Sequence, residues 1–143
     1  MQTFLPYPDF AQSAAVLDRG RLGKQRVEAK QIYLSLRGKG AWVNHPAVKM
    51  WAGYEQALLE YGLAVCSEWR SRGYADTLKP WFSRRINWGN YRPKPAWLGN
   101  YAFHLSHQSN LVRKDAKHYR GYFPDVPADL PYVWPTRAQG TIQ

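Results

Sequence analysis

The longest helical pattern in the sequence is the feature that most limits what this chain can fold into. Across residues 46–73, apolar side chains recur at intervals of three and four, as they do on one face of an α-helix. Pro46 suits the first turn of a helix, and Gly73 suits its end. The pattern therefore predicts one long helix over residues 46–73, with a potential bend at Gly62.

Three shorter segments have helical patterns of their own. Asp9 is a suitable N-cap for a short helix over residues 10–17. Apolar residues recur at helical spacing over residues 21–37, and Gly38 ends that pattern. A final helix is predicted over residues 101–118. These segments, together with the long one, predict an all-α fold.

Proline marks the remaining parts of the chain. Residues 74–99 contain three prolines, several glycines and asparagines and little periodicity, which predicts a long, ordered aromatic loop. Residues 123–135 are too rich in proline for a helix and too apolar for free coil, so we expect an extended strap. No segment has a strand pattern, and no linker or repeat divides the sequence. We expect one compact domain over residues 1–143.

The charge of the chain points to a polyanionic partner. The sequence has 20 Lys and Arg against 10 Asp and Glu, a formal net charge of +10. Such a field suits nucleic acid. The sequence contains no apolar run of the roughly 20 residues that span a bilayer, and no secretory signal pattern. We therefore expect a cytoplasmic, monomeric protein that does not bind membranes.

The aromatic content is also high, with seven Trp, ten Tyr and five Phe. Some of these residues alternate with cations and amides, as in residues 81–92 and 118–123. This arrangement is typical of surfaces on which bases stack while Arg and Lys hold phosphates. For any single aromatic residue, packing in the core is an equally good explanation.

Most cofactor and catalytic motifs are missing from the sequence. His104 and His107 could face one metal ion, but no neighbouring carboxylate or cysteine completes a ligand set. Neither a phosphate-binding loop, nor a dinucleotide fingerprint, nor a nucleophile elbow occurs. Cys66 is the only cysteine, so no internal disulfide can form. We predict no metal and no cofactor.

One acid stands among many cations. Glu28 lies in the stretch RLGKQRVEAK, and no other Asp or Glu occurs between Asp18 and Glu55. The helical pattern places it at the edge of the apolar face, in a row with Arg21, Lys24 or Gln25, and Gln31. Glu28 therefore either reduces charge repulsion or acts on a substrate that the cations attract.

With the other catalytic motifs missing, an amine is the type of nucleophile that remains to be considered. A chain-terminal amine has an ordinary pKa of about 7.7–8.0, far below the lysine value near 10.4, so more of it is free base at neutral pH. The Met1 amine is therefore one candidate, although most chain ends are simply frayed. Apolar residues at Phe4 and Leu5 favour an anchored end. Lys24 and Lys30 are the alternative amines.

Four segments resemble, in order, the pyrimidine-dimer DNA glycosylases of the phage endonuclease V type. They are residues 17–28 (LDRGRLGKQRVE), 44–51 (NHPAVKMW), 68–74 (EWRSRGY) and 106–114 (SHQSNLVRK). The chain looks closest to a bacterial branch that opens Met-Gln-Thr-Phe-Leu-Pro-Tyr. The resemblance implies a compact, all-helical, metal-free DNA glycosylase with a coupled lyase activity at the abasic site.

The resemblance also implies residue roles. By analogy, the Met1 amine attacks the sugar carbon C1′, an imine forms, and β-elimination nicks the strand. Glu28 matches the family's essential carboxylate, Arg21 a position near the bent DNA, and Lys114 a basic position on the last helix. Together with the basic and aromatic patterns, this predicts DNA contacts from Arg21, Lys24, Arg26, His45, Arg84, Arg85, Arg113, Lys114, Tyr119 and Tyr122. The partner would be double-stranded DNA with a lesion or modified base.

The sequence departs from the family at three points. Gln2 is large, so Met1 should be retained, whereas the phage enzyme loses its initiator methionine. Val27 replaces a cation just before the family carboxylate, and the first eight residues are longer and carry prolines. The identity of the excised base therefore does not follow from the resemblance. Two alternatives remain, a non-catalytic nucleic-acid-binding module and a glycosylase without strand cleavage that is specific for another modified base.

Overall fold

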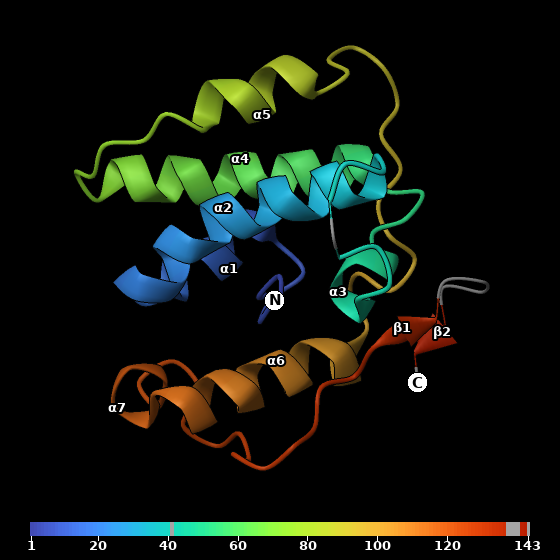
Figure 1. Cartoon of the computed structure of the whole chain (residues 1–143). Helices are drawn as coiled ribbons and strands as arrows, with labels where there is room; N and C mark the ends of the chain where they lie inside the picture. Colours follow the sequence, from blue (N-terminus) through green and yellow to red (C-terminus); the bar gives the residue numbers. More distant parts are fainter. Residues whose placement is uncertain (41, 137–140, 143) are drawn as a thin grey trace.

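Helices dominate the computed structural model, which describes residues 1–40, 42–136 and 141–142. The helices are α1 (Phe10–Val16), α2 (Arg19–Leu36), α3 (Pro46–Lys49), α4 (Glu55–Ser71), α5 (Lys79–Arg85), α6 (Tyr101–Lys114) and α7 (Ala116–Tyr119). Helices α2 and α4 pack along each other, α5 covers α4 on one side, and α6 lies on the opposite side of the molecule (Figure 1). The all-α prediction is confirmed.

Two aspartates start the first two helices. The side chain of Asp9 accepts a hydrogen bond from the Gln12 backbone amide, 2.9 Å away, and so caps α1 as predicted. The side chain of Asp18 caps α2 in the same way, by accepting from the Arg21 amide. Helix α2 therefore starts at Arg19, two residues before the predicted helix.

The single long helix predicted over residues 46–73 is wrong. The chain forms α3, turns at Gly53, whose φ of 86° suits glycine, and then forms α4. The apolar pattern continues through the turn because Trp51 is fully buried there. Gly62 lies inside α4, where a Cβ atom would come within 2.2 Å of the Phe82 ring. This glycine therefore allows α5 to pack closely on α4.

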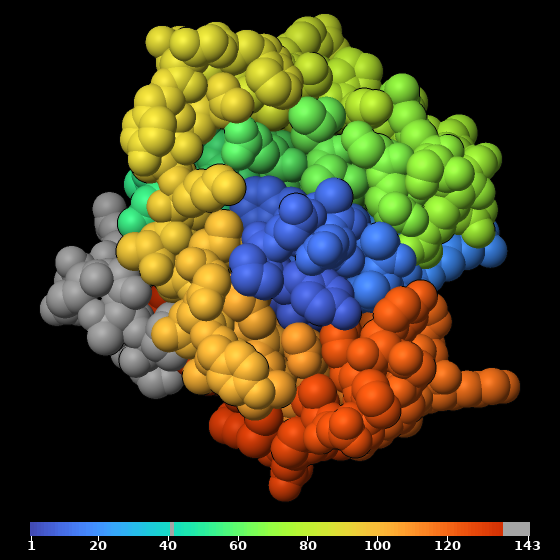
Figure 2. All heavy atoms as spheres, turned by 180° about the vertical axis from the view of Figure 1, so that it is seen from behind, coloured from blue at the N-terminus to red at the C-terminus, as the bar shows by residue number. Residues whose placement is uncertain are grey.

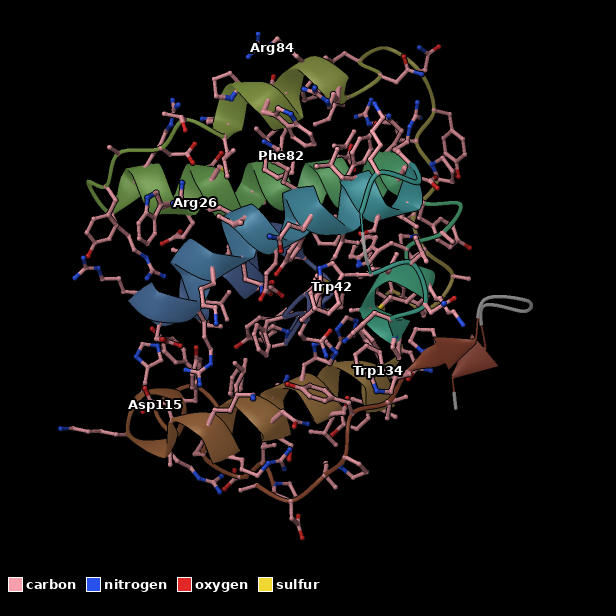
Figure 3. The ribbon with its side chains drawn as sticks, viewed as in Figure 1. Arg26, Trp42, Phe82, Arg84, Asp115 and Trp134 are labelled. Atoms are coloured by element: carbon pink, nitrogen blue, oxygen red, sulfur yellow. The ribbon has the colours of Figure 1, made fainter. Side chains whose placement is uncertain are left out.

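Two further predictions need correction. The predicted loop over residues 74–99 contains α5, which buries Phe82 against α4 (Figure 3). The predicted final helix over residues 101–118 is divided at Asp115, whose backbone angles (φ −154°, ψ 78°) are not helical and end α6. The Asp115 side chain then caps α7 by accepting from the His118 amide. Asp115 thus ends one helix and starts the next, although the apolar periodicity continues from residue 101 to residue 118.

The C-terminal part packs on α6 as the predicted strap. Residues 123–134 form no helix or strand, and their carbonyl groups accept hydrogen bonds from Asn110 and Arg113. The strap then enters β1 (Pro135–Thr136), which pairs antiparallel with β2 (Thr141–Ile142). Pro135 lies opposite Ile142, and Thr136 lies opposite Thr141. The expectation that no strand would form was therefore wrong.

The segment before α1 runs through the middle of the molecule. Gln2, Thr3, Phe4 and Leu5 are all buried, and Leu5 is fully enclosed. In Figure 2 the first residues and α1, in blue, fill the space between the α6 and α7 region, in orange, and α4, in green. The chain opening is thus part of the core. None of the described helices is both long enough and apolar enough to cross a membrane.

Candidate active site

Side chains of α6 hold the backbone of the opening segment. The Leu5 amide donates to Nδ1 of His107 over 2.9 Å, and Nδ1 of His104 lies 2.8 Å from the Leu5 carbonyl oxygen. Gln108 donates to the Pro6 carbonyl over 2.8 Å. The His104 and His107 pair, considered above as a metal site, therefore clamps one backbone residue. Burial lowers the pKa of His107 to about 3, so its imidazole is neutral. Its unprotonated Nδ1 can therefore accept the hydrogen bond from the Leu5 amide.

Gln25 joins the opening segment to the acid of α2. Its side-chain nitrogen donates to the Gln2 carbonyl over 2.8 Å and to Oε2 of Glu28 over 2.9 Å. Its side-chain oxygen accepts from the Phe4 amide over 3.0 Å and lies 2.5 Å from the Tyr61 hydroxyl. Gln25 is only 1% exposed, so these bonds compete little with water. They fix the Glu28 carboxylate relative to the second residue of the chain.

Tyr61 stabilises this arrangement from α4. Its hydroxyl also lies 3.0 Å from the Phe4 carbonyl. Burial, and then the charge of Glu28, raise the pKa of Tyr61 well above its ordinary value. The phenol therefore keeps its proton and remains a donor. The Gln25 contacts thus rest on a partner whose protonation does not change at physiological pH.

A cavity of about 430 Å³, which we call the terminal cavity, brings the opening segment, α2, α6 and the strap together. Its lining includes Met1, Arg21, Lys24, Glu28, Lys114 and Tyr132. The Gln2 amide nitrogen lies 3.5 Å from Oε2 of Glu28. Among the described residues, the Met1 amine has no hydrogen bond or ion pair, and Oε1 of Glu28 accepts no hydrogen bond. Both groups therefore have capacity left for a ligand in this cavity.

The cations of the terminal cavity differ in their partners. Arg21 pairs with Asp18 at 3.0 Å, and the same carboxylate accepts from the Tyr119 hydroxyl. Burial raises the pKa of Asp18, but the hydrogen bonds from Tyr119 and Arg21 outweigh it and lower the pKa below its ordinary value. Lys24 and Lys114 are exposed and form no ion pair in the part of the chain that the structure describes. They are the side-chain cations of this cavity that no carboxylate of the described residues pairs with.

His45 lies beside this site on the α3 side. Its Nδ1 accepts from the Ala47 amide over 3.0 Å and caps α3. Its ring packs edge-on against the rings of Trp42 and Trp134, with centroids 6.4 and 6.3 Å away. Burial, and then the charge of the chain-terminal amine, lower the pKa of His45, while the Glu28 carboxylate opposes this shift. The pKa of His45 is thus influenced by both the Met1 amine and the Glu28 carboxylate.

Four cations considered in the sequence lie away from the terminal cavity. Arg26 forms an ion pair with the buried carboxylate of Asp76. Arg84 and Arg85 belong to α5, and Arg84 projects from the outer side of that helix (Figure 3). Arg85 and the ammonium group of Lys30 lie over the Trp81 ring, at 4.0 and 5.1 Å from its centroid. Lys30 is therefore not placed to act together with Glu28.

The remaining candidates lie around α6 and α7. Tyr119 is fully buried and its hydroxyl contacts Asp18, so it orients that carboxylate from inside the protein. Tyr122 is 48% exposed and packs on His118. Arg113 is exposed and donates to the Ala128 carbonyl of the strap. Tyr122 therefore has an exposed aromatic ring, whereas the Tyr119 ring has no exposed surface.

Sequence reasoning did not identify three residues of this site. Gln25 was visible only as a member of the polar row on α2, three residues before Glu28, and nothing in that row indicates its bonds to Gln2 and Phe4. His107 carried a signal that pointed to metal instead. Tyr132 lines the cavity from the strap and had no local signal at all.

The fold and the site together define an all-α protein with a basic cavity, an available amine and the fixed carboxylate of Glu28. A family model described as pyrimidine dimer DNA glycosylase matches residues 1–80. The chain belongs to the pyrimidine dimer DNA glycosylase family, and it is a DNA repair glycosylase whose substrate is DNA. Searches of curated proteins and of solved structures found no match. The match includes Met1, Arg21, Lys24 and Glu28, whereas Lys114 and Tyr132 lie beyond it.

Proposed function

We propose that the protein excises a damaged or modified base and then cleaves the strand at the abasic site. The Met1 amine would be the nucleophile, and Glu28 the acid that assists it. One observation carries this proposal: both residues line the terminal cavity, and Gln25 bonds Glu28 to the segment that begins with Met1.

The proposed reaction begins with the unprotonated Met1 amine. The amine adds to C1′ while the bond between C1′ and the base breaks, and the base leaves with the bonding electrons and takes up a proton. The attacking nitrogen gives up one proton, and the C–N bond then becomes an iminium as the sugar ring opens and O4′ takes up a proton. Loss of a proton from C2′ then breaks the C3′–O bond, and the phosphate leaves with that electron pair. Water finally hydrolyses the imine and releases the amine.

Glu28 would act at two of these steps. Its negative charge stabilises the positive charge that develops on the sugar as the base departs. It then accepts the C2′ proton as a general base. Oε2 is held by Gln25, while Oε1 accepts no hydrogen bond from the described residues and can turn to the substrate.

Lys24, Arg21 and Lys114 would hold the phosphates on either side of the extruded nucleotide. Lys24 and Arg21 lie on α2, and Lys114 lies at the end of α6, so cations border the terminal cavity from two sides. Contacts of this kind position the DNA without reading its sequence. The exposed Tyr122 offers a surface for stacking a base.

Borohydride trapping with an abasic-site duplex tests the nucleophile directly. We expect a covalent adduct, and digestion with trypsin locates it. Residues 1–19 form one tryptic peptide that contains no lysine, so an adduct on this peptide must lie on the Met1 amine. An adduct on a peptide containing Lys24 would transfer the role to that lysine. A protein that binds the duplex but gives no adduct would be a non-catalytic DNA-binding module.

Glu28→Gln tests the acid. The amide keeps the shape of the side chain but cannot take a proton, so base excision and strand nicking should each fall by about 10²–10⁴-fold. DNA binding should persist. Glu68→Gln is the matched control, because Glu68 pairs with Arg72 on α4 and does not line the terminal cavity. Unchanged excision and nicking in Glu28→Gln would remove Glu28 from the mechanism.

A further inference from the structure

A second cavity meets the terminal cavity at Glu28. It has a volume of about 700 Å³, and we call it the Trp69 cavity. The two cavities share Gly20, Lys24 and Glu28. Met1 lines only the terminal cavity, whereas Val27, Gln31 and Trp69 line only the Trp69 cavity. Glu28 therefore lies on the border between an amine on one side and an open space on the other.

We propose that the Trp69 cavity receives the nucleobase that is excised. This inference rests on the proposed function. In a displacement at C1′, the attacking amine and the departing base occupy opposite sides of the carbon. A sugar held at Glu28, with the Met1 amine on its terminal-cavity side, directs its base to the other side of Glu28. The Trp69 cavity is the space located there, and its volume lies within the range of about 300–1,000 Å³ that is usual for small-ligand sites.

The wall that Trp69 forms is rigid. The indole nitrogen donates to the Ala75 carbonyl over 2.9 Å, the Arg26 guanidinium lies 4.7 Å from its ring centroid, and the Tyr74 ring lies 4.4 Å away. Gly23 lets this ring lie against α2, because a Cβ at that position would be 3.0 Å from the indole. Arg26, predicted to contact DNA, thus supports the wall of this cavity.

Two exposed side chains of α2, Val27 and Gln31, also line the Trp69 cavity. Val27 is 45% exposed and offers an apolar surface to a flat ring. Gln31 is exposed, and its side-chain amide makes no hydrogen bond with the described residues. An amide can donate to and accept from the polar edge of a base. The cavity therefore suits a planar base with both donors and acceptors, and Gln31 is the residue that would select among such bases.

Val27→Trp, which fills the cavity, tests the inference on two duplexes. One carries a base that the wild-type protein releases, and the other carries an abasic site, which has no base to accommodate. We expect the single-turnover rate of base excision to fall by at least about 10-fold, as for other changes of pocket shape. Borohydride trapping on the abasic duplex should stay within about 2-fold of wild type.

Gln31→Trp is a second variant with the same expectation, and Gln12→Trp is the control. Gln12 is exposed on α1 and lines neither cavity, so this variant should match wild type on both duplexes. Normal excision by both cavity variants overturns the inference. Equal loss on both duplexes also overturns it, since the cavity would then hold another part of the DNA. A wild-type protein that forms no adduct with the abasic duplex contradicts the proposed function itself, whatever the cavity variants do.

Discussion

The side-chain amide of Gln25 donates 2.9 Å to Oε2 of Glu28, and the same nitrogen donates 2.8 Å to the carbonyl oxygen of Gln2. One buried group thus sets both the direction of the acid and the path of the chain beside it. Gln25 is buried, and its side-chain nitrogen and oxygen both have hydrogen-bond partners within the protein, so the arrangement does not depend on a substrate. A fixed geometry of this kind lowers the entropic cost of bringing a nucleophile and an acid to one carbon atom.

Replacing Gln25 with methionine should destabilise the fold. The change preserves the approximate size of the side chain but leaves the Phe4 amide and the Gln2 carbonyl without their partner, while the Tyr61 hydroxyl keeps only the Phe4 carbonyl. Each buried polar group left unpaired costs about 1–3 kcal/mol, so the free energy of unfolding should fall by about 2–5 kcal/mol. Urea denaturation measures it. Gln31→Met, on the exposed face of the same helix, should change stability by less than about 0.5 kcal/mol. Similar values for the two variants would contradict the role of Gln25.

Stability should fall in mild acid because of His107. Its pKa is about 3 in the folded protein, below the ordinary value of 6.5, so the unfolded chain binds a proton first as the pH falls. The contribution is fully present above pH 6.5 and is lost towards pH 3, with a slope that approaches about 1.4 kcal/mol per pH unit. His104, whose pKa burial also lowers, acts in the same direction.

Urea denaturation between pH 7 and pH 5 measures this slope. In His107→Gln the side chain at this position no longer titrates, so the variant should lose less stability than wild type over the same interval. Parallel curves for the two proteins would show that His107 is not the titrating group.

The salt dependence of DNA binding should separate the two groups of predicted cations. Lys114→Ala removes an unpaired cation at the terminal cavity, so the logarithmic slope of affinity against salt should decrease by about 0.9. Arg84→Ala should leave the slope unchanged, because Arg84 projects from the outer side of α5 (Figure 3). Fluorescence anisotropy with one duplex at several salt concentrations gives both slopes. A decrease for Arg84→Ala would place α5 in the DNA interface.

Gly62→Ala should weaken the packing of α5 on α4. The added methyl group would lie 2.2 Å from the Phe82 ring, and Phe82 is fully buried. Overpacking of this kind costs about 1–3 kcal/mol, which thermal unfolding would detect as a lower Tm. Gly20→Ala is the comparison, since the nearest atom to a Cβ there is Oδ2 of Asp18, 3.5 Å away, and alanine favours the helix. Equal effects of the two changes would argue against a tight contact at Gly62.

Periodicity and caps were enough to predict much of the helical structure. Asp9 starts α1 as its position indicated, and the pattern over residues 21–37 gives α2 with a shift of two residues at its start. The break between α3 and α4 could not be predicted from the pattern, because Trp51 in the turn is as buried as the helical residues around it. Helix α5 was missed because prolines and glycines dominate the sequence around it.

The sequence by itself determined the helical class, the net positive charge and the single acid at the edge of α2. These properties depend on residues close together in the chain and on simple sums. Only the tertiary structure decided where the opening segment lies and which cations face it. His107 contacts Leu5 across 102 positions, and Tyr119 contacts Asp18 across 101. Hydrogen bonds over such separations form only when the helices pack, so no local pattern could show that Lys114 shares a cavity with Met1 while Arg84 does not.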